Sequence, residues 1–238
     1  GVKEARAAVD AKTVAVLAGI LLFAVALDLA DTPFPRLPVL SEKNSFLNQW
    51  FFKLGWAWTL AAWLLPLLVA GPSPAPPQAS GVAAGARGRD EEPWRAWARA
   101  VARVAVATAL WYVFVGCFNT LQFYSGSCSN EAIDHPRHCT REGHEWSGVD
   151  ISGHCFLIVF SSLILWSESK KRVGCKGAVG EAIEWGVLGM RLLWFVGLWA
   201  TCCYFHEVHD KVLGCLFGAM CWYLTYGLLP LYLDLLLP

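Results

Sequence analysis

The sequence predicts an all-α, polytopic membrane protein with about six transmembrane helices. Of its 238 residues, 56% are hydrophobic and only 16% are charged, whereas soluble domains are about a quarter charged. The apolar residues also fall in long blocks, and about 20 mostly apolar residues are what a helix needs to cross the hydrocarbon core. We expect a single transmembrane domain over residues 1–238. The formal net charge of zero gives no sign of a nucleic-acid partner.

Six segments are apolar enough to be membrane spans. The first contains Asp28 near its end, and because no small-residue cleavage site follows it, we expect it to be retained as a span. The fourth is short and starts beside a histidine. The last contains Pro230, which is expected to kink or end its helix. The six segments are residues 13–30, 50–70, 100–123, 152–167, 183–204 and 211–236.

The charges of the connecting segments predict the orientation of the chain. Residues 71–93 are rich in Pro, Gly, Ala and Ser, which is typical of a disordered linker. Lys and Arg gather at the end of this linker, near the N-terminus and after the fourth span, and such positive segments generally stay in the cytosol. We therefore expect both termini and the linker to be cytosolic. The lumenal loop is then residues 125–151, with 31–49 and 205–210 on the same side.

Two of the nine cysteines, Cys128 and Cys139, lie in this lumenal loop. An oxidising compartment favours a disulfide between them, whereas the other seven lie in or beside spans and are expected to be small membrane residues. The loop's histidines have metal-like spacing around Cys139, but zinc needs four well-placed ligands, so we expect a disulfide-braced loop without a metal. These histidines are His135, His138 and His144.

The stretch DISGH, residues 150–154, combines a helix start with an ionisable group. Asp150 and Ser152 are favoured N-cap residues, and Gly153 lets a ligand approach the backbone closely. His154 then falls in the first turn of the fourth span. Backbone N–H groups and the helix dipole attract phosphate there, and an imidazole can transfer protons. The alternative is a capped helix whose histidine only sits in the membrane interface.

The stretch YFHEVHDKVLGCLFG, residues 204–218, holds a second candidate. If it is helical, Asp210 lies one turn after His206, where a carboxylate can fix the tautomer of an imidazole and raise its basicity. Gly214 and Gly218 continue the same face and allow close helix packing. The alternative is a polar hinge between two spans.

The predicted topology brings His154 and His206 to the same membrane face, because the fourth span starts in the lumen and the fifth ends there. Two histidines beside a helix N-terminus at a lipid–water boundary suit phosphoryl transfer on an amphipathic phosphate. One attacks phosphorus while the other protonates the leaving oxygen. This chemistry requires no metal and no cofactor.

These motifs resemble known families. SGH, followed later by a histidine with Asp and two glycines at four-residue steps, resembles two motifs of the lipid phosphate phosphatase superfamily. Most of the chain outside the linker and the first span resembles the fat storage-inducing transmembrane family, and DISGH and the WYLTYG ending are closer to its second member. The matching stretches are NSFLNQWFFKLGWAWT (44–59), YSGSC (124–128), CTREGHEWSGVDISGHCFL (139–157) and YFHEVHDKVLGCLFGAMCWYLTYG (204–227).

The resemblance implies a function as well as a fold. It implies a six-span protein of the endoplasmic reticulum membrane that supports lipid-droplet formation and binds diacylglycerol and triacylglycerol. It also implies a fatty acyl-CoA diphosphatase that releases acyl 4′-phosphopantetheine and adenosine 3′,5′-bisphosphate. Through the matching motifs, His206 is implied as the nucleophile, His154 as the general acid and Asp210 as the orienting carboxylate.

The chain departs from the superfamily in its phosphate-binding residues. The Lys–Arg–Pro clamp is not visible, and Trp199 and Ala200 stand where a Ser-Arg pair is expected. Lys53, at the lumenal start of the second span, is the cation best placed to neutralise phosphate, and Arg137 and Arg141 of the lumenal loop are the other candidates. With Lys53, we expect Ser152 and Gly153 to bind the substrate. The missing clamp argues against plain phosphatidate hydrolysis.

Two alternative functions remain open. One is a non-catalytic lipid-partitioning protein that binds diacylglycerol or triacylglycerol, and the other is a generic lipid phosphate phosphatase.

Overall fold

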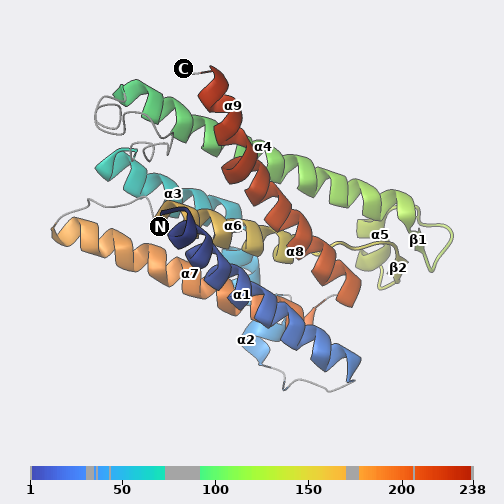
Figure 1. The fold of residues 1–238 in the computed structure, drawn as a ribbon. Coiled ribbons are helices and arrows are strands. Elements are labelled where there is room, and N and C mark those ends of the chain that lie inside the picture. The colour runs from blue at the N-terminus through green and yellow to red at the C-terminus, as the bar shows by residue number, and fades with distance from the viewer. Residues whose placement is uncertain are drawn as a thin grey trace.

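The computed structural model describes residues 2–30, 35, 37–42, 44–72, 92–169, 177–205 and 207–236, which are mostly helical (Figure 1). A short two-stranded antiparallel ribbon pairs Ser127 with Ser147 and Cys128 with Trp146. In chain order the elements are α1 Val2–Leu29, α2 Pro38–Ser41, the π-helical η1 Leu47–Phe52, α3 Gly55–Ala70, α4 Pro93–Ser125, β1 Ser127–Cys128, α5 Pro136–Arg141, β2 Trp146–Ser147, α6 Gly153–Ser169, α7 Ala178–Tyr204, α8 Val208–Tyr223, the π-helical η2 Leu224–Leu228 and α9 Leu229–Leu236.

The apolar helices confirm the predicted fold class. Within the described residues, three helices are long and apolar enough to cross a membrane: Pro93–Ser125, Ala178–Tyr204 and Val208–Leu235. Three shorter apolar helices, Thr13–Leu29, Gly55–Ala70 and Gly153–Ser169, match the remaining predicted spans. The protein is therefore an all-α membrane protein.

The short helix α6 forms the core of the bundle. It contacts α1, α3, α4, α7 and α8, and in Figure 1 it lies among them. Every side chain from Cys155 to Leu165 is buried against protein. A helix that is apolar on all sides belongs in an interior, and here neighbouring helices rather than lipid cover it.

Contacts between distant segments define the two ends of the bundle. At one end the Ser152 N–H donates to the Asp210 carbonyl (3.2 Å), and Gln122 Nε2 donates to Asp150 Oδ1 (2.9 Å). We call this the histidine end, because His154 lies there in the first turn of α6. Successive spanning helices alternate in direction, so α1, α4 and α7 finish at the histidine end while α6 and α8 start there.

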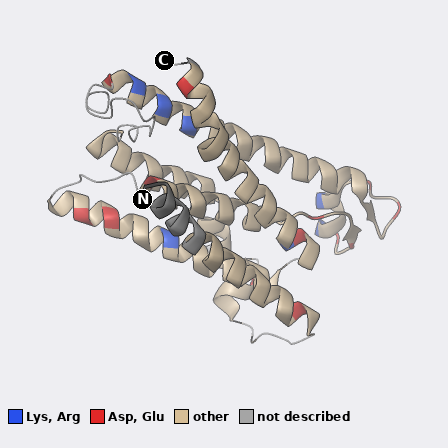
Figure 2. Cartoon of the chain, viewed as in Figure 1, with Lys and Arg blue, Asp and Glu red and all other residues tan. Residues whose placement is uncertain are grey.

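The opposite end is held by charged contacts of α4. Arg99 pairs with Asp234 (3.1 Å), and Arg103 pairs with the buried Glu168 (3.4 Å). In Figure 2 the basic residues of α4 gather near its start, at the end that we expect to be cytosolic. Residues 73–91 of the predicted 71–93 linker lie outside the described residues. Pro93, which we placed in that linker, is the first residue of α4, a position where proline's missing N–H costs nothing.

Pro230 does not end the last helix, contrary to one of our two expectations. The helix runs from Val208 through η2 and continues to Leu236. Proline cannot donate a helical hydrogen bond, and its ring crowds the carbonyl four residues earlier. The wider π-helical turns of Leu224–Leu228 end two residues before Pro230, and such turns change the local geometry of a helix.

The residues between α4 and α6 fold into a small cap on the histidine end. Cys128 and Cys139 are joined by a disulfide, the pair that the sequence suggested, and pack with Ile133 into a second small core. The Trp146 indole covers this core and lies against Gly126, where a Cβ would be 2.2 Å from its Nε1. The Trp146 Nε1–H also donates to the Gln122 carbonyl (3.0 Å), which fastens the cap to α4.

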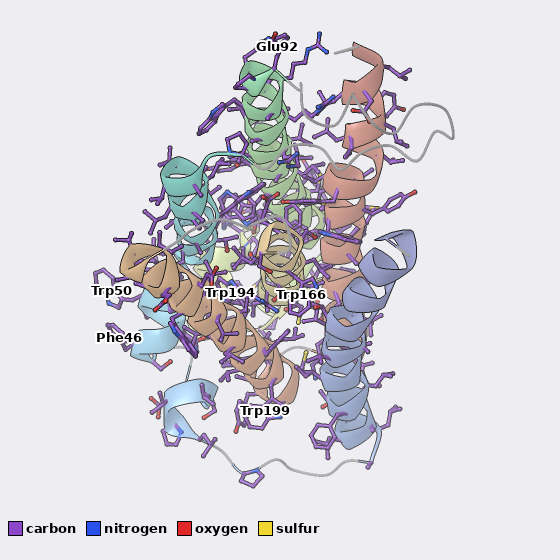
Figure 3. All side chains as sticks on the ribbon, turned by 60° about the vertical axis from the view of Figure 1, so that its left-hand side comes forward. Phe46, Trp50, Glu92, Trp166, Trp194 and Trp199 are labelled. Atoms are coloured by element: carbon purple, nitrogen blue, oxygen red, sulfur yellow. A yellow bond between two sulfur atoms is a disulfide. The ribbon has the colours of Figure 1, made fainter. Side chains whose placement is uncertain are left out.

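Aromatic side chains fill the interior and also face outward. Trp194 is fully buried and contacts Phe51 and Phe52, with ring centroids 5.1 and 6.2 Å away. Phe46 and Trp50 instead point away from the bundle, as Figure 3 shows. Exposed aromatic side chains near helix ends are typical of the membrane interface.

Candidate active site

The start of α6 is capped as the DISGH stretch predicts. The Ser152 side chain is fully buried, and its Oγ accepts a hydrogen bond from the Cys155 N–H (3.2 Å). Gly153 is exposed, and a Cβ placed on it would have no neighbour within 4 Å. No packing contact in the described structure therefore requires glycine here, and the space beside the first turn of α6 is open.

His154 lies in that first turn and is half-buried. Its ring meets the ring of Phe52 edge to face, with centroids 5.9 Å apart and an interplanar angle of 87°. Phe52 is itself buried beside Trp194 at the end of η1. Phe52 thus forms an apolar support that restricts the orientation of the imidazole.

The second predicted stretch is not one continuous helix. α7 ends at Tyr204, and α8 starts at Val208. Glu207, the N-cap residue of α8, is extended (φ −80°, ψ 167°), so the helical turn that holds Asp210 begins after it. His206 itself lies outside the described residues. The pairing of His206 with Asp210 therefore stays a prediction.

Asp210 is buried in the first turn of α8. Its Oδ1 lies 3.2 Å from Nε2 of His209, a histidine that is 59% exposed. Its backbone carbonyl accepts the hydrogen bond from Ser152, so the first turns of α6 and α8 touch directly. Backbone N–H groups of two helix starts therefore converge at the histidine end, which favours an anion there.

Two glycines make this close approach possible, as predicted. A Cβ on Gly214 would lie 2.5 Å from the Ser152 carbonyl oxygen, and one on Gly218 would lie 2.7 Å from the Phe156 carbonyl oxygen. Both glycines are buried. Any larger residue would push α8 away from α6 and separate the two helix starts.

The sequence did not lead us to an ion pair between a buried lysine and a partly exposed aspartate beside this site. Lys211 is 2% exposed, and its Nζ donates to Asp28 Oδ2 of α1. An ionisable residue inside a span usually has a partner, so Asp28 was the available signal. Its partner could not be identified, because the two residues are 183 positions apart in the chain. The pair ties α1 to the first turn of α8.

Lys53, the predicted phosphate-neutralising cation, is exposed at the end of η1. Its Nζ donates to Gln49 Oε1, one turn back along the same segment. Lys53 directly follows Phe52, the residue that contacts His154. Its backbone therefore lies near the histidine, while its side chain is bonded along η1.

The cap histidines have local partners. His138 pairs with Glu142 (2.8 Å), and His144 Nε2 lies 3.3 Å from Asn130 Nδ2. Cys139, the sulfur in the metal-like spacing, is used in the disulfide. Among the described residues, no group of three His, Cys, Asp or Glu side chains is arranged to hold a metal ion.

Comparisons with known proteins identify the family of the chain. A sequence model described as fat storage-inducing transmembrane protein matches residues 37–124 and 125–184. Acyl-coenzyme A diphosphatase FITM2 of Mus musculus is 33% identical over 228 residues, covering 90% of this chain and 80% of its own. The proteins of the same name from Bos taurus and Homo sapiens are 32% and 31% identical, each covering 82% of this chain and 74% of their own. No solved structure matches. The chain belongs to the fat storage-inducing transmembrane protein family.

Proposed function

We propose that this protein is a fatty acyl-CoA diphosphatase of the endoplasmic reticulum membrane, with its active site at the histidine end and facing the lumen. The observation that carries the proposal is the hydrogen bond from Ser152 to Asp210, which joins the start of α6 to the start of α8. His154 follows the first of these residues, and His206 precedes the second. The names of the relatives supply the reaction, and the converging helix starts supply a place for its pyrophosphate.

The reaction that we propose proceeds in two displacements. A nitrogen of His206 bonds to the pantetheine-side phosphorus while the bridging P–O bond breaks. His154 donates a proton to the leaving oxygen of adenosine 3′,5′-bisphosphate. The neutral His154 then takes a proton from water, whose oxygen bonds to phosphorus and releases acyl 4′-phosphopantetheine and free His206.

The phosphate charge is met by groups already described. Open space beside Gly153 lets pyrophosphate oxygens approach the N–H groups at the start of α6. Lys53 can turn from Gln49 toward the same region, because its side chain is exposed. The Asp210 carboxylate can accept hydrogen bonds from nearby donors. It does not bind the phosphate, because two anions repel.

We assign the pantetheine-side phosphorus as the centre of attack because the acyl chain anchors that half of the substrate among the apolar helices. The nucleotide half is soluble and can leave first. The protein also supports lipid-droplet formation in this proposal, and diacylglycerol and triacylglycerol bind among the same helices. A lipid-partitioning protein without catalysis is the second candidate, favoured by the many aromatic side chains at the bundle surface.

Product analysis by mass spectrometry separates these candidates. The purified protein in nanodiscs receives oleoyl-CoA or phosphatidic acid, as wild type, as His206→Ala and as His138→Ala. We expect acyl phosphopantetheine from oleoyl-CoA with wild type and with His138→Ala, an exposed cap histidine that pairs with Glu142. His206→Ala is expected to release none. Absence of product from both substrates, with lipid binding intact, would leave the partitioning function. Hydrolysis of phosphatidic acid in preference to oleoyl-CoA would indicate a generic phosphatase.

A further inference from the structure

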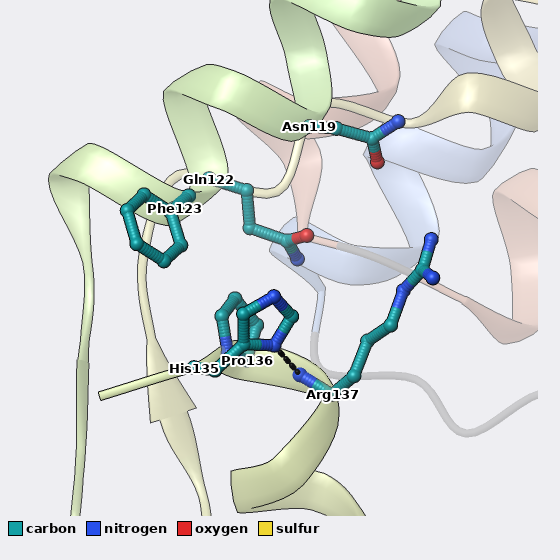
Figure 4. A pocket seen from close by; sticks show the side chains of 6 residues that line it. All are labelled: Asn119, Gln122, Phe123, His135, Pro136 and Arg137. Carbon is teal, nitrogen blue, oxygen red and sulfur yellow. Dashed lines mark hydrogen bonds between the residues drawn. The ribbon is translucent and has the colours of Figure 1, made fainter. Parts of the chain in front are cut away.

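A cavity lies beside the site, between the end of α4 and α5. It has a volume of about 300 Å³, at the small end of the range for small-molecule sites. We call it the α4–α5 pocket. Figure 4 shows its six lining residues: Asn119, Gln122, Phe123, His135, Pro136 and Arg137.

The α4–α5 pocket lies at the histidine end of α4. α4 has 33 residues and is therefore about 50 Å long, whereas the hydrocarbon core is about 30 Å thick. The pocket takes its α4 residues, Asn119 to Phe123, from the last two turns of that helix. His135, Pro136 and Arg137 belong to the cap on the histidine end, so a ligand can reach the pocket from the water at that end.

The lining of the pocket suits an anion that carries a flat, hydrogen-bonding ring. Arg137 supplies a guanidinium group, and in the part of the chain that the structure describes no carboxylate pairs with it. Asn119 and Gln122 add carboxamides, which can both donate and accept hydrogen bonds. Phe123 adds an aromatic ring that is 39% exposed and so offers a surface for stacking. No acidic side chain lines the pocket.

His135 adds a donor of defined direction. Its Nδ1 accepts a hydrogen bond from the Arg137 backbone N–H (3.2 Å), drawn as the dashed line in Figure 4. A neutral His135 therefore carries its proton on Nε2. The His135 ring also lies 5.8 Å from that of Phe123, so the two rings border the same space.

The pocket is joined to the start of α6 by direct contacts. Gln122 Nε2 donates to Asp150 Oδ1 (2.9 Å), and the Val149 N–H donates to Ser125 Oγ (3.0 Å). Asp150 precedes His154 by four residues, so their Cα atoms are at most about 14 Å apart. The pocket therefore lies close enough to His154 for one CoA molecule to reach both.

We propose that the α4–α5 pocket binds the adenosine 3′-phosphate portion of the CoA substrate. Arg137 pairs with the 3′-phosphate, Phe123 stacks on the adenine ring, and the two carboxamides bond to its edge. The inference rests on the proposed function, because that function puts the pyrophosphate at His154 and leaves the nucleoside to be placed nearby. In this proposal the α4–α5 pocket recognises the nucleotide, and the apolar helices of the bundle recognise the acyl chain.

Steady-state kinetics on two substrates test this assignment. The substrates are oleoyl-CoA and oleoyl-3′-dephospho-CoA, which lacks only the 3′-phosphate. Wild type is compared with Arg137→Ala and with Arg141→Ala, an exposed arginine of the same helix that does not line the pocket. The proteins are measured in phosphatidylcholine nanodiscs.

We expect Arg137→Ala to raise KM for oleoyl-CoA about tenfold, the usual size of a charge-assisted hydrogen bond, and to leave KM for the dephospho substrate unchanged. Arg141→Ala should match wild type on both.

Three results would overturn the proposal. The first is an unchanged KM in Arg137→Ala, and the second is an equal rise for both substrates. The third is an effect of Arg137→Ala that appears only when the nanodiscs contain phosphatidylserine, which would assign the pocket to a lipid headgroup.

Direct binding separates failure of the pocket from failure of the proposed function. If wild type hydrolyses neither substrate, the proposed function is wrong, and binding of adenosine 3′,5′-bisphosphate to the intact protein is measured instead. Weaker binding to Arg137→Ala and to Phe123→Ala than to wild type and Arg141→Ala supports the pocket. Equal binding to all four proteins, or none to wild type, contradicts it.

Discussion

Ser152 makes two hydrogen bonds, one that caps α6 and one that joins α6 to α8. Its Oγ caps α6 through the Cys155 N–H, and its own N–H bonds to the carbonyl of Asp210 on α8. The side chain is fully buried, so no water replaces a lost bond. The orientation of His154, two residues further on, depends on this capped turn.

Removing the Ser152 hydroxyl should therefore lower stability. We expect Ser152→Ala to lower the free energy of unfolding by about 1 kcal/mol, the typical value of an N-cap, and the melting temperature by about 2–4 °C. Thermal unfolding in nanodiscs measures this. Ser127→Ala, which removes an exposed hydroxyl, is the control and should change the melting temperature little. Equal melting temperatures for the two variants would contradict the capping role.

At the scale of elements, the short distance between α6 and α8 depends on the glycines of α8 that face α6. A Cβ at Gly214 would lie 2.5 Å from the Ser152 carbonyl oxygen, a backbone atom that cannot move aside alone. The two helix starts approach each other only with glycine at this position.

Gly214→Ala should separate the two helix starts. We expect a loss of about 1–3 kcal/mol of stability, as for overpacked cores, and a lower rate of oleoyl-CoA hydrolysis. Gly186→Ala on α7 is the matched control, because a Cβ there would have no neighbour within 4 Å. That variant should be neutral or slightly stabilising, since alanine favours helix over glycine. Equal losses in both variants would mean that the contact with Ser152 is unimportant.

The ion pair between α1 and α8 gives a second prediction at this scale. Asp28→Asn leaves the buried Lys211 ammonium without its carboxylate, which should cost about 1–3 kcal/mol, because the Asp28 side of the pair is partly exposed. Adding Lys211→Met removes the uncompensated charge, so the double variant should recover most of the loss. Unfolding of the two single variants and the double variant forms a double-mutant cycle. Additive losses would show that the two residues do not interact.

At the scale of the whole molecule, the two ends differ in charge and in structure. The histidine end carries the disulfide-braced cap, while the opposite end carries Arg99 and Arg103 of α4 with their carboxylate partners. Positive charge near short loops is typical of the cytosolic side, so the cap should face the lumen.

Glycosylation tests this orientation. Ala132→Thr converts Asn130-Glu131-Ala132 into an acceptor sequence within the cap. We expect this variant, expressed in cells, to gain a glycan that endoglycosidase H removes. An Asn-Gly-Thr insertion in the 71–93 linker should gain none. Glycosylation of the linker insertion, without glycosylation of the cap, would reverse the proposed orientation.

The fold class was predictable because apolar blocks of spanning length have few alternatives in a membrane. The N-cap hydrogen bond of α6 was also predictable, because it joins Ser152 to Cys155, only three residues further along the chain. The start of α8 at Val208 was not, because an extended Glu207 interrupts a sequence that otherwise reads as helical. The Asp28–Lys211 pair and the α4–α5 pocket join segments that only tertiary packing brings together.

The central claim is that a covalent intermediate on His206 is formed and resolved with the help of His154. Rapid mixing of the protein with oleoyl-CoA, an alkaline quench and peptide mass analysis test it most directly. We expect the peptide containing His206 to carry an acyl phosphopantetheinyl group that rises and falls ahead of free product. In His154→Ala both formation and loss of the adduct should slow, by about 10²–10⁴-fold for a missing acid–base group. Release of product by His206→Ala at the wild-type rate, with no adduct, would contradict the claim.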